Sequence, residues 1–299
     1  MFAERGAWWR AWALLWPSWI ILGALFLVPL AMLFFVSLHQ ADDLGNAQPI
    51  ADWRAYLHSG QVLSNYSDSM EPLFLRIHLR SFWLAVVTTV LCLAIGYPVA
   101  YFIALVAPPR RKNLLLALAV VPFWTSFLIR IAAWRLILAD QGLLNSLLIN
   151  LHLVHEPLRL LDTTLAVMIG LVYGELPFMI LPLYASLEKL DRSLLEASAD
   201  LGAPPAATFF RVTVPMTLPG IIAGIVLVFI PGIGQFIVSD MLGGARTMLI
   251  GNMIQDQFTS GRNKPLGAAL AFELTAMVLA LLVAYALYAR GRTASEGLV

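Results

Sequence analysis

The sequence predicts an all-α membrane protein with six transmembrane helices and one polar segment between the fourth helix and the fifth. Of its 299 residues, 60% are hydrophobic and only 12% are charged. With a mean hydropathy of +0.80, this composition is too apolar for a water-soluble fold of this size. Crossing the hydrocarbon core of a bilayer takes about 20 apolar residues. Long enough stretches lie at 17–38, 81–106, 113–138, 164–187, 217–239 and 266–289. Because lipid cannot hydrogen-bond an open backbone, each is expected to be a helix.

The first apolar stretch is expected to be an uncleaved span. Arg5 and Arg10 precede it, as basic residues precede a secretory signal. Its apolar core is longer than that of a signal peptide, however, and "FFVSLHQADD" offers no small-residue cleavage pattern.

Basic residues predict the orientation of the chain in the membrane. Segments at alternate ends of the spans differ in Lys and Arg content, and the richer side is expected to be cytoplasmic. That side would hold both termini and the residues Arg5, Arg10, Arg110, Arg111, Lys112, Lys189, Arg192, Arg211, Arg290 and Arg292. The loops around 39–78, 139–163 and 240–264 are poorer in basic residues and are expected outside. The sequence thus predicts a multi-pass inner-membrane protein with both termini in the cytoplasm.

Several prolines and two closely spaced glycines lie within the predicted spans. Each internal proline removes a backbone donor, and the resulting kink either lines a pathway or has no functional role; these are Pro122, Pro177, Pro182 and Pro231. In "GIIAG", Gly220 and Gly224 lie on one helix face and favour close packing against a neighbouring helix.

Composition argues against several other organisations and sites. No long Gly/Ser linker, charge block or short repeat divides residues 1–299, so a single transmembrane domain is expected. The net charge of +1 does not suggest a nucleic-acid partner. The single Cys92 can form no intrachain disulfide. No acidic or thiol ligand set surrounds His152 and His155, so no metal site is expected.

The polar segment 188–216 is predicted to form a helix–turn–helix at the membrane surface. "SLLEASADLG" has helical character and a stop at Gly202, and "APPAATFFRVTVPMTLP" continues into a second short helix. Its charges are consistent with a solvated face. The small residues Ala197, Ser198, Ala199 and Gly202 would in addition let the backbone of another protein approach closely.

This segment resembles the signature of bacterial ABC importer permeases: EAA, three residues, G, nine residues, then I-x-L-P. Here Glu196, Ala197 and Ser198 are followed by Gly202 and then, after nine residues, by the run from Val212 to Pro215. Ser198 replaces Ala, Val212 replaces Ile and Val214 replaces Leu, and all three changes preserve size or apolar character. The resemblance implies a coupling helix that fits a groove on a cytoplasmic ATPase.

The resemblance extends over most of residues 80–270. "VPFWTSFLIR" at 121–130, "GLLN" at 142–145, the run at 172–197 and "SDMLGG" at 239–244 are similar to the PotB/PotH branch of spermidine/putrescine permeases. It implies a type I ABC importer fold, polyamine transport, a second related permease, an ATPase dimer and a periplasmic binding protein. Related permeases for another amine, an amino-acid-like compound or an organic ion share much of the pattern.

The energy for transport is expected to come from a partner, not from this chain. No G-x-x-x-x-G-K-[ST] phosphate-binding loop occurs, so the chain is expected to be a non-catalytic subunit without a cofactor, with ATP and Mg²⁺ used by the ATPase. A secondary transporter is the main alternative, but it would not need the ATPase-docking signature. A membrane-embedded hydrolase is a further alternative, but no H-E-x-x-H or G-x-S-x-G motif supports it.

Acidic residues within the spans are candidates for a substrate pathway. Glu175 lies about ten residues into the fourth span, or about 15 Å at helical rise, near the bilayer midplane. Glu273 lies less deep in the sixth span and Asp240 at the outer end of the fifth. Such carboxylates would attract a cationic amine, with cation–π contacts from Trp124, Tyr173 and Phe178. Alternatively they are structural, paired with Arg130 or Arg135 or bonded to the backbone of a broken helix.

Overall fold

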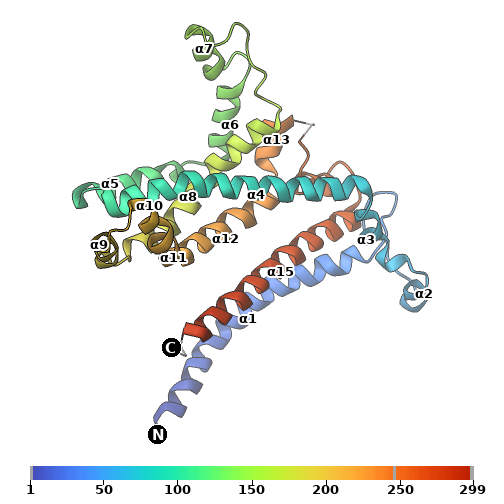
Figure 1. Ribbon diagram of the computed structural model, residues 1–299. Coiled ribbons are helices and arrows are strands. Elements are labelled where there is room, and N and C mark those ends of the chain that lie inside the picture. Colours follow the sequence, from blue (N-terminus) through green and yellow to red (C-terminus); the bar gives the residue numbers. More distant parts are fainter. Residues whose placement is uncertain (1–2, 245–246, 297–299) are drawn as a thin grey trace. The chain divides into compact units, whose positions relative to one another are not determined.

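A computed structural model describes the backbone of residues 3–244 and 247–296, and the side chains of residues 15–244 and 247–287. Helices make up almost all of the regular structure in this part of the chain (Figure 1). Residues Ala41 and Ala47 form an isolated antiparallel bridge. The predicted all-α class is confirmed.

Within the described part of the chain, four helices are long and apolar enough to cross a membrane unaided. They are α1 (Ala3–Ser37), α4 (Pro72–Tyr101, continued by the π-helical η2, Phe102–Val106), α8 (Thr164–Glu188) and α15 (Lys264–Glu296). They cover the first, second, fourth and sixth predicted spans. Pro177 and Pro182 lie inside α8 without ending it.

The third predicted span is not one continuous helix. α5 (Pro109–Val120) and the 3₁₀ turn η3 (Val121–Trp124) lead to a break, after which α6 (Phe127–Leu138) and α7 (Leu143–Asn150) follow at a bend of 90°. Thr125 and Ser126 have extended ψ angles of 152° and 135° at this break. Pro122 supplies no amide hydrogen to the turn before it.

The fifth predicted span is also bent. α10 (Pro205–Thr208), the π-helical η4 (Phe209–Thr213) and α11 (Val214–Met216) meet α12 (Leu218–Gly234) at 67°, and α13 (Ile237–Gly243) follows. Pro231 lies inside α12. Counting each bent pair as one span gives up to six spans by length and composition.

The remaining helices are short. They are α2 (Trp53–His58), η1 (Gln61–Leu63), α3 (Ser64–Ser69), α9 (Arg192–Asp200) and α14 (Ile250–Phe258). The chain divides into two compact units, residues 1–75 with 253–299, and residues 76–252. Both boundaries fall within helices, α4 and α14. The single transmembrane domain over residues 1–299 stays a prediction.

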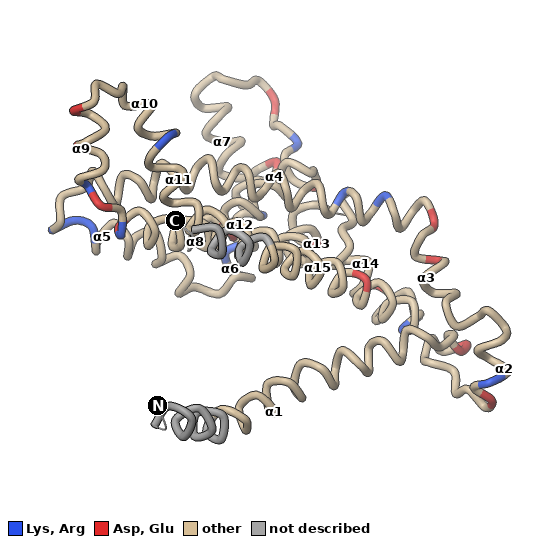
Figure 2. The backbone as a smooth tube through the Cα atoms, turned by 60° about the horizontal axis from the view of Figure 1, so that its bottom comes forward, with Lys and Arg blue, Asp and Glu red and all other residues tan. Residues whose placement is uncertain are grey.

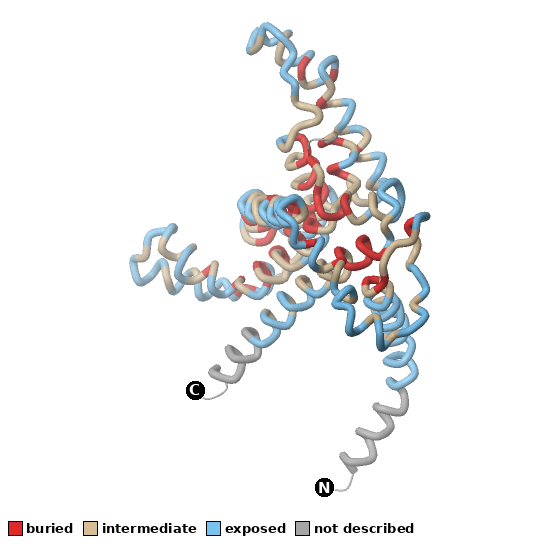
Figure 3. Tube along the Cα trace, turned by 90° about the vertical axis from the view of Figure 1, so that its right-hand side faces the viewer, coloured by how far each residue is buried: buried red, intermediate tan, exposed pale blue. Residues whose placement is uncertain are grey.

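In the first unit, α1 and α15 run side by side (Figure 1). The rings of Phe34 and Phe272 lie 4.9 Å apart between them. The Asn65 amide on α3 donates to the carbonyl oxygens of Ser37 and His39 at 2.8 and 2.7 Å, which satisfies the end of α1. Much of the remaining surface of α1 is exposed and apolar (Figure 3), as expected of a lipid-facing helix.

In the second unit, α8 and α12 pack closely at the predicted glycines. A Cβ built on Gly220 would lie 2.7 Å from the Pro182 carbonyl oxygen and 2.5 Å from the Ser186 side chain. A Cβ on Gly224 would lie 2.6 Å from the sulfur of Met179. The sequence-based prediction of close packing at Gly220 and Gly224 is therefore confirmed.

Replacing Gly220 with Leu is expected to destabilise the second unit by about 1–3 kcal/mol, the usual effect of overpacking, since the Pro182 backbone cannot move aside cheaply. The apparent melting temperature of the purified transporter in detergent would report the loss. Gly23→Leu is the matched control, because a Cβ at Gly23 meets nothing within 4 Å. Equal melting temperatures for both variants would contradict the close packing.

Candidate functional site

The surface helix–turn–helix is built around α9, whose two ends are both capped. The Asp191 carboxylate accepts the Ser193 amide hydrogen at 3.0 Å, and this hydrogen bond lowers the pKa of Asp191. At the other end, the amides of Gly202 and Ala203 donate to the carbonyl oxygens of Ala199 and Ser198 at 2.8 and 3.1 Å. Gly202 has a φ of +76°, so this is a Schellman stop, which favours glycine. The predicted helix and its stop are confirmed.

A side-chain hydrogen bond closes the turn between the two arms. The hydroxyl groups of Ser198 on α9 and Thr208 on α10 lie 2.8 Å apart. Ser198 is one of the departures from the signature, and the alanine of the common motif could not make this bond. The substitution therefore has a structural role in this chain.

The second arm is anchored in the core of the unit. The ring of Phe209 packs edge-on against Tyr97 and Tyr101 of α4, at centroid distances of 5.4 and 6.0 Å. The Tyr97 hydroxyl lies 2.8 Å from Thr217 Oγ1, which also donates to the Thr213 carbonyl. These contacts fix the segment to the helices that precede and follow it.

The outer face of this segment is open. Glu196 and Ala197 are exposed, and a Cβ at Gly202 would meet nothing within 4 Å. Leu201 and Phe210, both apolar, are 88% and 69% exposed. Val212 is half-buried, whereas Pro215 is exposed. An open face of small residues with exposed large apolar neighbours is typical of a protein-binding surface.

Charged residues gather at the end of the second unit formed by α5 and α9, while α8 and α12 carry few (Figure 2). Arg110, Arg111 and Lys112 open α5, and Arg192 on α9 donates to the Leu105 carbonyl at 3.3 Å. The surface segment therefore lies at the charged end of the second unit, next to the apolar helices α8 and α12.

A second candidate site surrounds Glu175 on α8, which is only 4% exposed. The guanidinium of Arg130 on α6 interacts electrostatically with its carboxylate. The same guanidinium lies over two aromatic rings, 4.8 Å from the centroid of Phe123 and 5.6 Å from that of Phe127. We call Glu175, Phe123, Phe127 and Arg130 the cation cage.

Several polar atoms of the cation cage lack hydrogen-bond partners among the described residues. They are Oε2 of Glu175 and Nε and Nη1 of Arg130, and all three are buried. Orphaned buried polar atoms carry a free-energy penalty that packing or function must offset. The cage therefore combines a carboxylate, aromatic faces and unsatisfied polar atoms within one compact unit.

Residues 96–292 match the family model described as "binding-protein-dependent transport system inner membrane component". The chain belongs to this family. The spermidine/putrescine transport system permease protein PotB of Escherichia coli (strain K12) is 43% identical over 254 residues, covering 85% of this chain and 92% of that protein. PotB of Haemophilus influenzae is 46% identical over 224 residues, covering 75% and 78%.

Solved structures show the same fold. A bacterial ABC transporter involved in alginate import aligns with a TM-score of 0.72 at 16% identity, over 94% of this chain and 95% of that chain. The MetNI methionine ABC transporter aligns with a TM-score of 0.56 at 18% identity, over 74% and 98%. The predicted ABC permease fold and the resemblance to PotB-type permeases are thus confirmed. This family is one of non-catalytic permease subunits, not of secondary transporters or hydrolases.

Within this permease, the predicted aromatic pathway residues lie in different surroundings. Phe178 packs edge-on against Phe123 at 5.0 Å, which places it at the rim of the cation cage. Trp124 is 85% exposed, and Tyr173 pairs with Trp134 at 5.4 Å. Sequence reasoning missed Phe123 and Phe127 as cage residues. The signal for Phe127 is its position three residues before Arg130, which places both on one helix face.

The other two candidate carboxylates have different surroundings. Asp240 is exposed in the first turn of α13. Glu273 belongs to the first unit, where its carboxylate accepts a hydrogen bond from Ser69 at 2.5 Å. Arg135, an alternative partner considered for Glu175, donates instead to the Met241 carbonyl at 3.4 Å.

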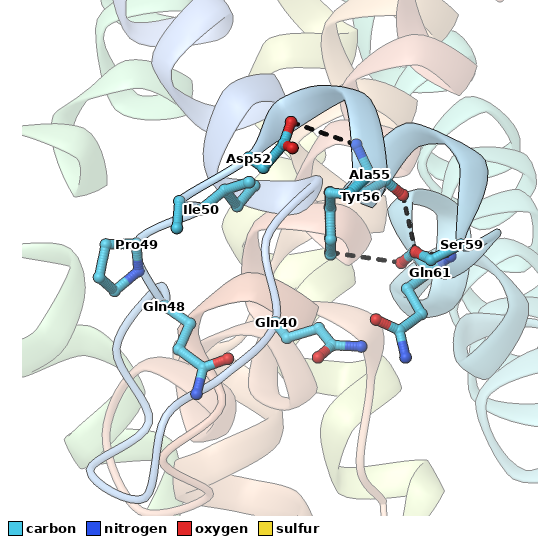
Figure 4. Close-up of a pocket in the computed structure, with 10 residues that line it drawn as sticks. Gln40, Gln48, Pro49, Ile50, Asp52, Ala55, Tyr56, Ser59 and Gln61 are labelled. Carbon is cyan, nitrogen blue, oxygen red and sulfur yellow. Dashed lines mark hydrogen bonds between the residues drawn. The ribbon is translucent and has the colours of Figure 1, made fainter.

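A separate pocket lies in the first unit and contains none of the predicted site residues (Figure 4). Its volume is about 390 Å³, and its lining residues are Gln40, Gln48, Pro49, Ile50, Ala51, Asp52, Ala55, Tyr56, Ser59 and Gln61. Asp52 caps α2 through the amide of Arg54. The pocket has polar and apolar lining residues and belongs to the segment expected on the outer side of the membrane.

Proposed function

We propose that this chain is the permease subunit through which an ATP-driven ABC importer moves polyamines, such as spermidine and putrescine, into the cytoplasm. The observation that carries this proposal is the 43–46% identity to permeases named for spermidine/putrescine transport, over most of the chain. The cation cage supports it, because a carboxylate with aromatic faces suits an organic cation.

A permease for another amine, an amino-acid-like compound or an organic ion is the alternative. The fold does not decide between these substrates, since an alginate importer shares it at 16% identity. Uptake of labelled spermidine in competition with putrescine, amino acids and organic anions tests the proposal. Competition by amines alone would support it, and competition by anions alone would overturn it.

The surface segment is proposed to be the coupling site for the ATPase. Small exposed residues let a partner approach the α9 backbone, and the exposed Leu201 offers an apolar contact. The proposed contact residues are Glu196, Ala197, Ser198, Gly202, Val212 and Pro215. ATP and Mg²⁺ would act in the partner, with the anchors at Phe209 and Thr217 transmitting its movement to the spans.

The distribution of basic residues supports an orientation with both termini and the coupling segment in the cytoplasm. The segment with the pocket around Asp52 would then face a periplasmic binding protein. One similar structure is an alginate transporter in complex with its periplasmic protein. A second, homologous permease would complete the channel.

Glu175 is proposed as the principal cation position of the pathway, with Phe178 at its rim. Asp240 and Glu273 are secondary positions, and Trp124 and Tyr173 are further aromatic candidates. The hydrogen bond from Ser69 gives Glu273 a structural role as well.

Glu196→Lys and Gly202→Trp are expected to lower transport-coupled ATP hydrolysis about tenfold or more, because each disturbs one close contact worth about 1.4 kcal/mol. Gly23→Trp is the control for added bulk, because a Cβ at Gly23 also meets nothing within 4 Å and Gly23 lies on α1 in the first unit. Hydrolysis would be measured in the assembled transporter. Normal coupled hydrolysis in both Glu196→Lys and Gly202→Trp would refute the docking role.

Cysteines placed at the exposed positions Arg111 and Arg192 are expected to be shielded from impermeant thiol reagents in intact cells, whereas those at Asp52 and Glu156 react. Labelling before and after permeabilisation, in a Cys92→Ala background, measures this. The inverted pattern would place the surface segment on the wrong side for a cytoplasmic ATPase.

Glu175→Gln is expected to lower spermidine uptake at limiting substrate about tenfold, the effect of losing about 1.4 kcal/mol of cation attraction, while assembly and basal ATP hydrolysis persist. Glu273→Gln is expected to have a smaller effect. Glu188→Gln is the control, because this carboxylate also lies on α8 but accepts the Tyr184 hydroxyl at 2.6 Å. Wild-type uptake by both Glu175→Gln and Glu273→Gln would mean that other groups conduct the cation.

A further inference from the structure

The cation cage already contains a cation that belongs to the chain. The Arg130 guanidinium lies over Phe123 and Phe127 and interacts with the Glu175 carboxylate. Aromatic faces joined by a carboxylate form the arrangement with which proteins bind organic cations. The position proposed for a polyamine ammonium is thus held by a side chain of the same charge.

The contacts of Arg130 are not those of a permanent structural ion pair. A buried Arg–carboxylate pair is stabilised when the planar guanidinium donates two parallel hydrogen bonds and the remaining polar atoms are satisfied. Here Nε and Nη1 of Arg130 and Oε2 of Glu175 have no hydrogen-bond partner among the described residues. The unsatisfied atoms leave room for an exchange of partners, because a bound ammonium can donate where Arg130 does not.

The cage is assembled across the sharpest bend of the unit. Phe123 precedes the break at residues 125–126, whereas Phe127 and Arg130 follow it on α6. Phe127 also packs on α8, where a Cβ built on Gly174 would lie 3.1 Å from its ring. A change of the 90° bend would move Phe123 away from Arg130 while Phe127 stays on α8.

We propose that Arg130 is a tethered competitor for the cation position at Glu175. Between transport events its guanidinium occupies the cage and neutralises the carboxylate. An incoming polyamine ammonium displaces it, and its return helps to release the substrate. This inference rests on the proposed function, conduction of a polyamine past Glu175.

The test is spermidine uptake as a function of concentration by the complete transporter carrying Arg130→Gln. Removing the competitor is expected to lower KM about three- to tenfold, the effect of one cation–π contact of about 0.6–1.4 kcal/mol, without raising Vmax. Arg130→Lys keeps the charge and is expected to hold KM close to wild type. Arg135→Gln is the matched control, an exposed arginine on the same helix, and should leave KM unchanged.

An unchanged or higher KM for Arg130→Gln at normal assembly would overturn the proposal, since a structural arginine alters assembly, not substrate competition. If Arg130→Gln does not assemble, the double variant Arg130→Gln/Glu175→Gln leaves neither charge buried and is compared with Glu175→Gln alone. Higher uptake by the double variant at limiting spermidine supports the competitor, and equal uptake refutes it.

The two proposals fail in different ways. Wild-type uptake by Glu175→Gln would refute conduction past Glu175, and with it the role of Arg130 as a competitor. Reduced uptake by Glu175→Gln together with an unchanged KM for Arg130→Gln would refute only the role of Arg130 and leave the proposed pathway in place.

Discussion

The need to satisfy every backbone amide and carbonyl inside a lipid bilayer governs this structure. Helices meet that need within one segment, and the apolar spans are accordingly helical. Irregular backbone is tolerated only where protein or water covers it. The chain departs from a regular α-helix at the break at residues 125–126 and in the π-helical segments η2 and η4. Two cage residues, Phe123 and Phe127, flank the break, and the surface segment 188–216 contains η4, so both candidate sites lie where the regular helix is interrupted.

The carboxylates inside the predicted spans show two ways of handling an acid in an apolar setting. Glu273 accepts a hydrogen bond from Ser69, so a neutral neighbour stabilises it within the first unit. Glu175 instead faces a cation and retains an unsatisfied oxygen. The first arrangement is sufficient for packing. The second leaves a buried oxygen without a hydrogen bond, which has a free-energy cost even beside Arg130. For this reason Glu175, and not Glu273, carries the functional argument.

Apolar length and local signals were enough to predict α4, α8 and the capped helix α9, because each depends on neighbouring residues in sequence. The bend before Phe127 could not be predicted in this way. Pro122 lies at a 90° break, yet Pro177 and Pro182 leave α8 continuous. Whether a proline breaks a span depends on which tertiary neighbours satisfy the freed backbone groups.

The same break affects where the aromatic side chains around it lie. Trp124, a predicted pathway residue, is 85% exposed, and its neighbour Phe123 contacts Arg130. A 3₁₀ turn followed by two extended residues changes the direction in which successive side chains point. Helical periodicity therefore cannot be extended across it. Phe178 lies in the unbroken α8, and its ring packs against Phe123 at the cage rim.

Close packing at two glycines connects the surface segment to α8, the helix that carries Glu175. α12 begins directly after the anchored arm of that segment, and its Gly220 and Gly224 lie against Pro182, Ser186 and Met179 of α8. Contacts this tight leave little freedom to slide, so α8 and α12 are expected to move as one body. Met179 is one turn from Glu175 on α8. A displacement of the surface segment would then carry Glu175 with it, together with Phe127 of α6, which packs on Gly174 of α8, while Phe123 lies before the 90° bend. A change of this bend is the simplest way in which a partner that binds the surface segment could alter the affinity of the cage for its cation.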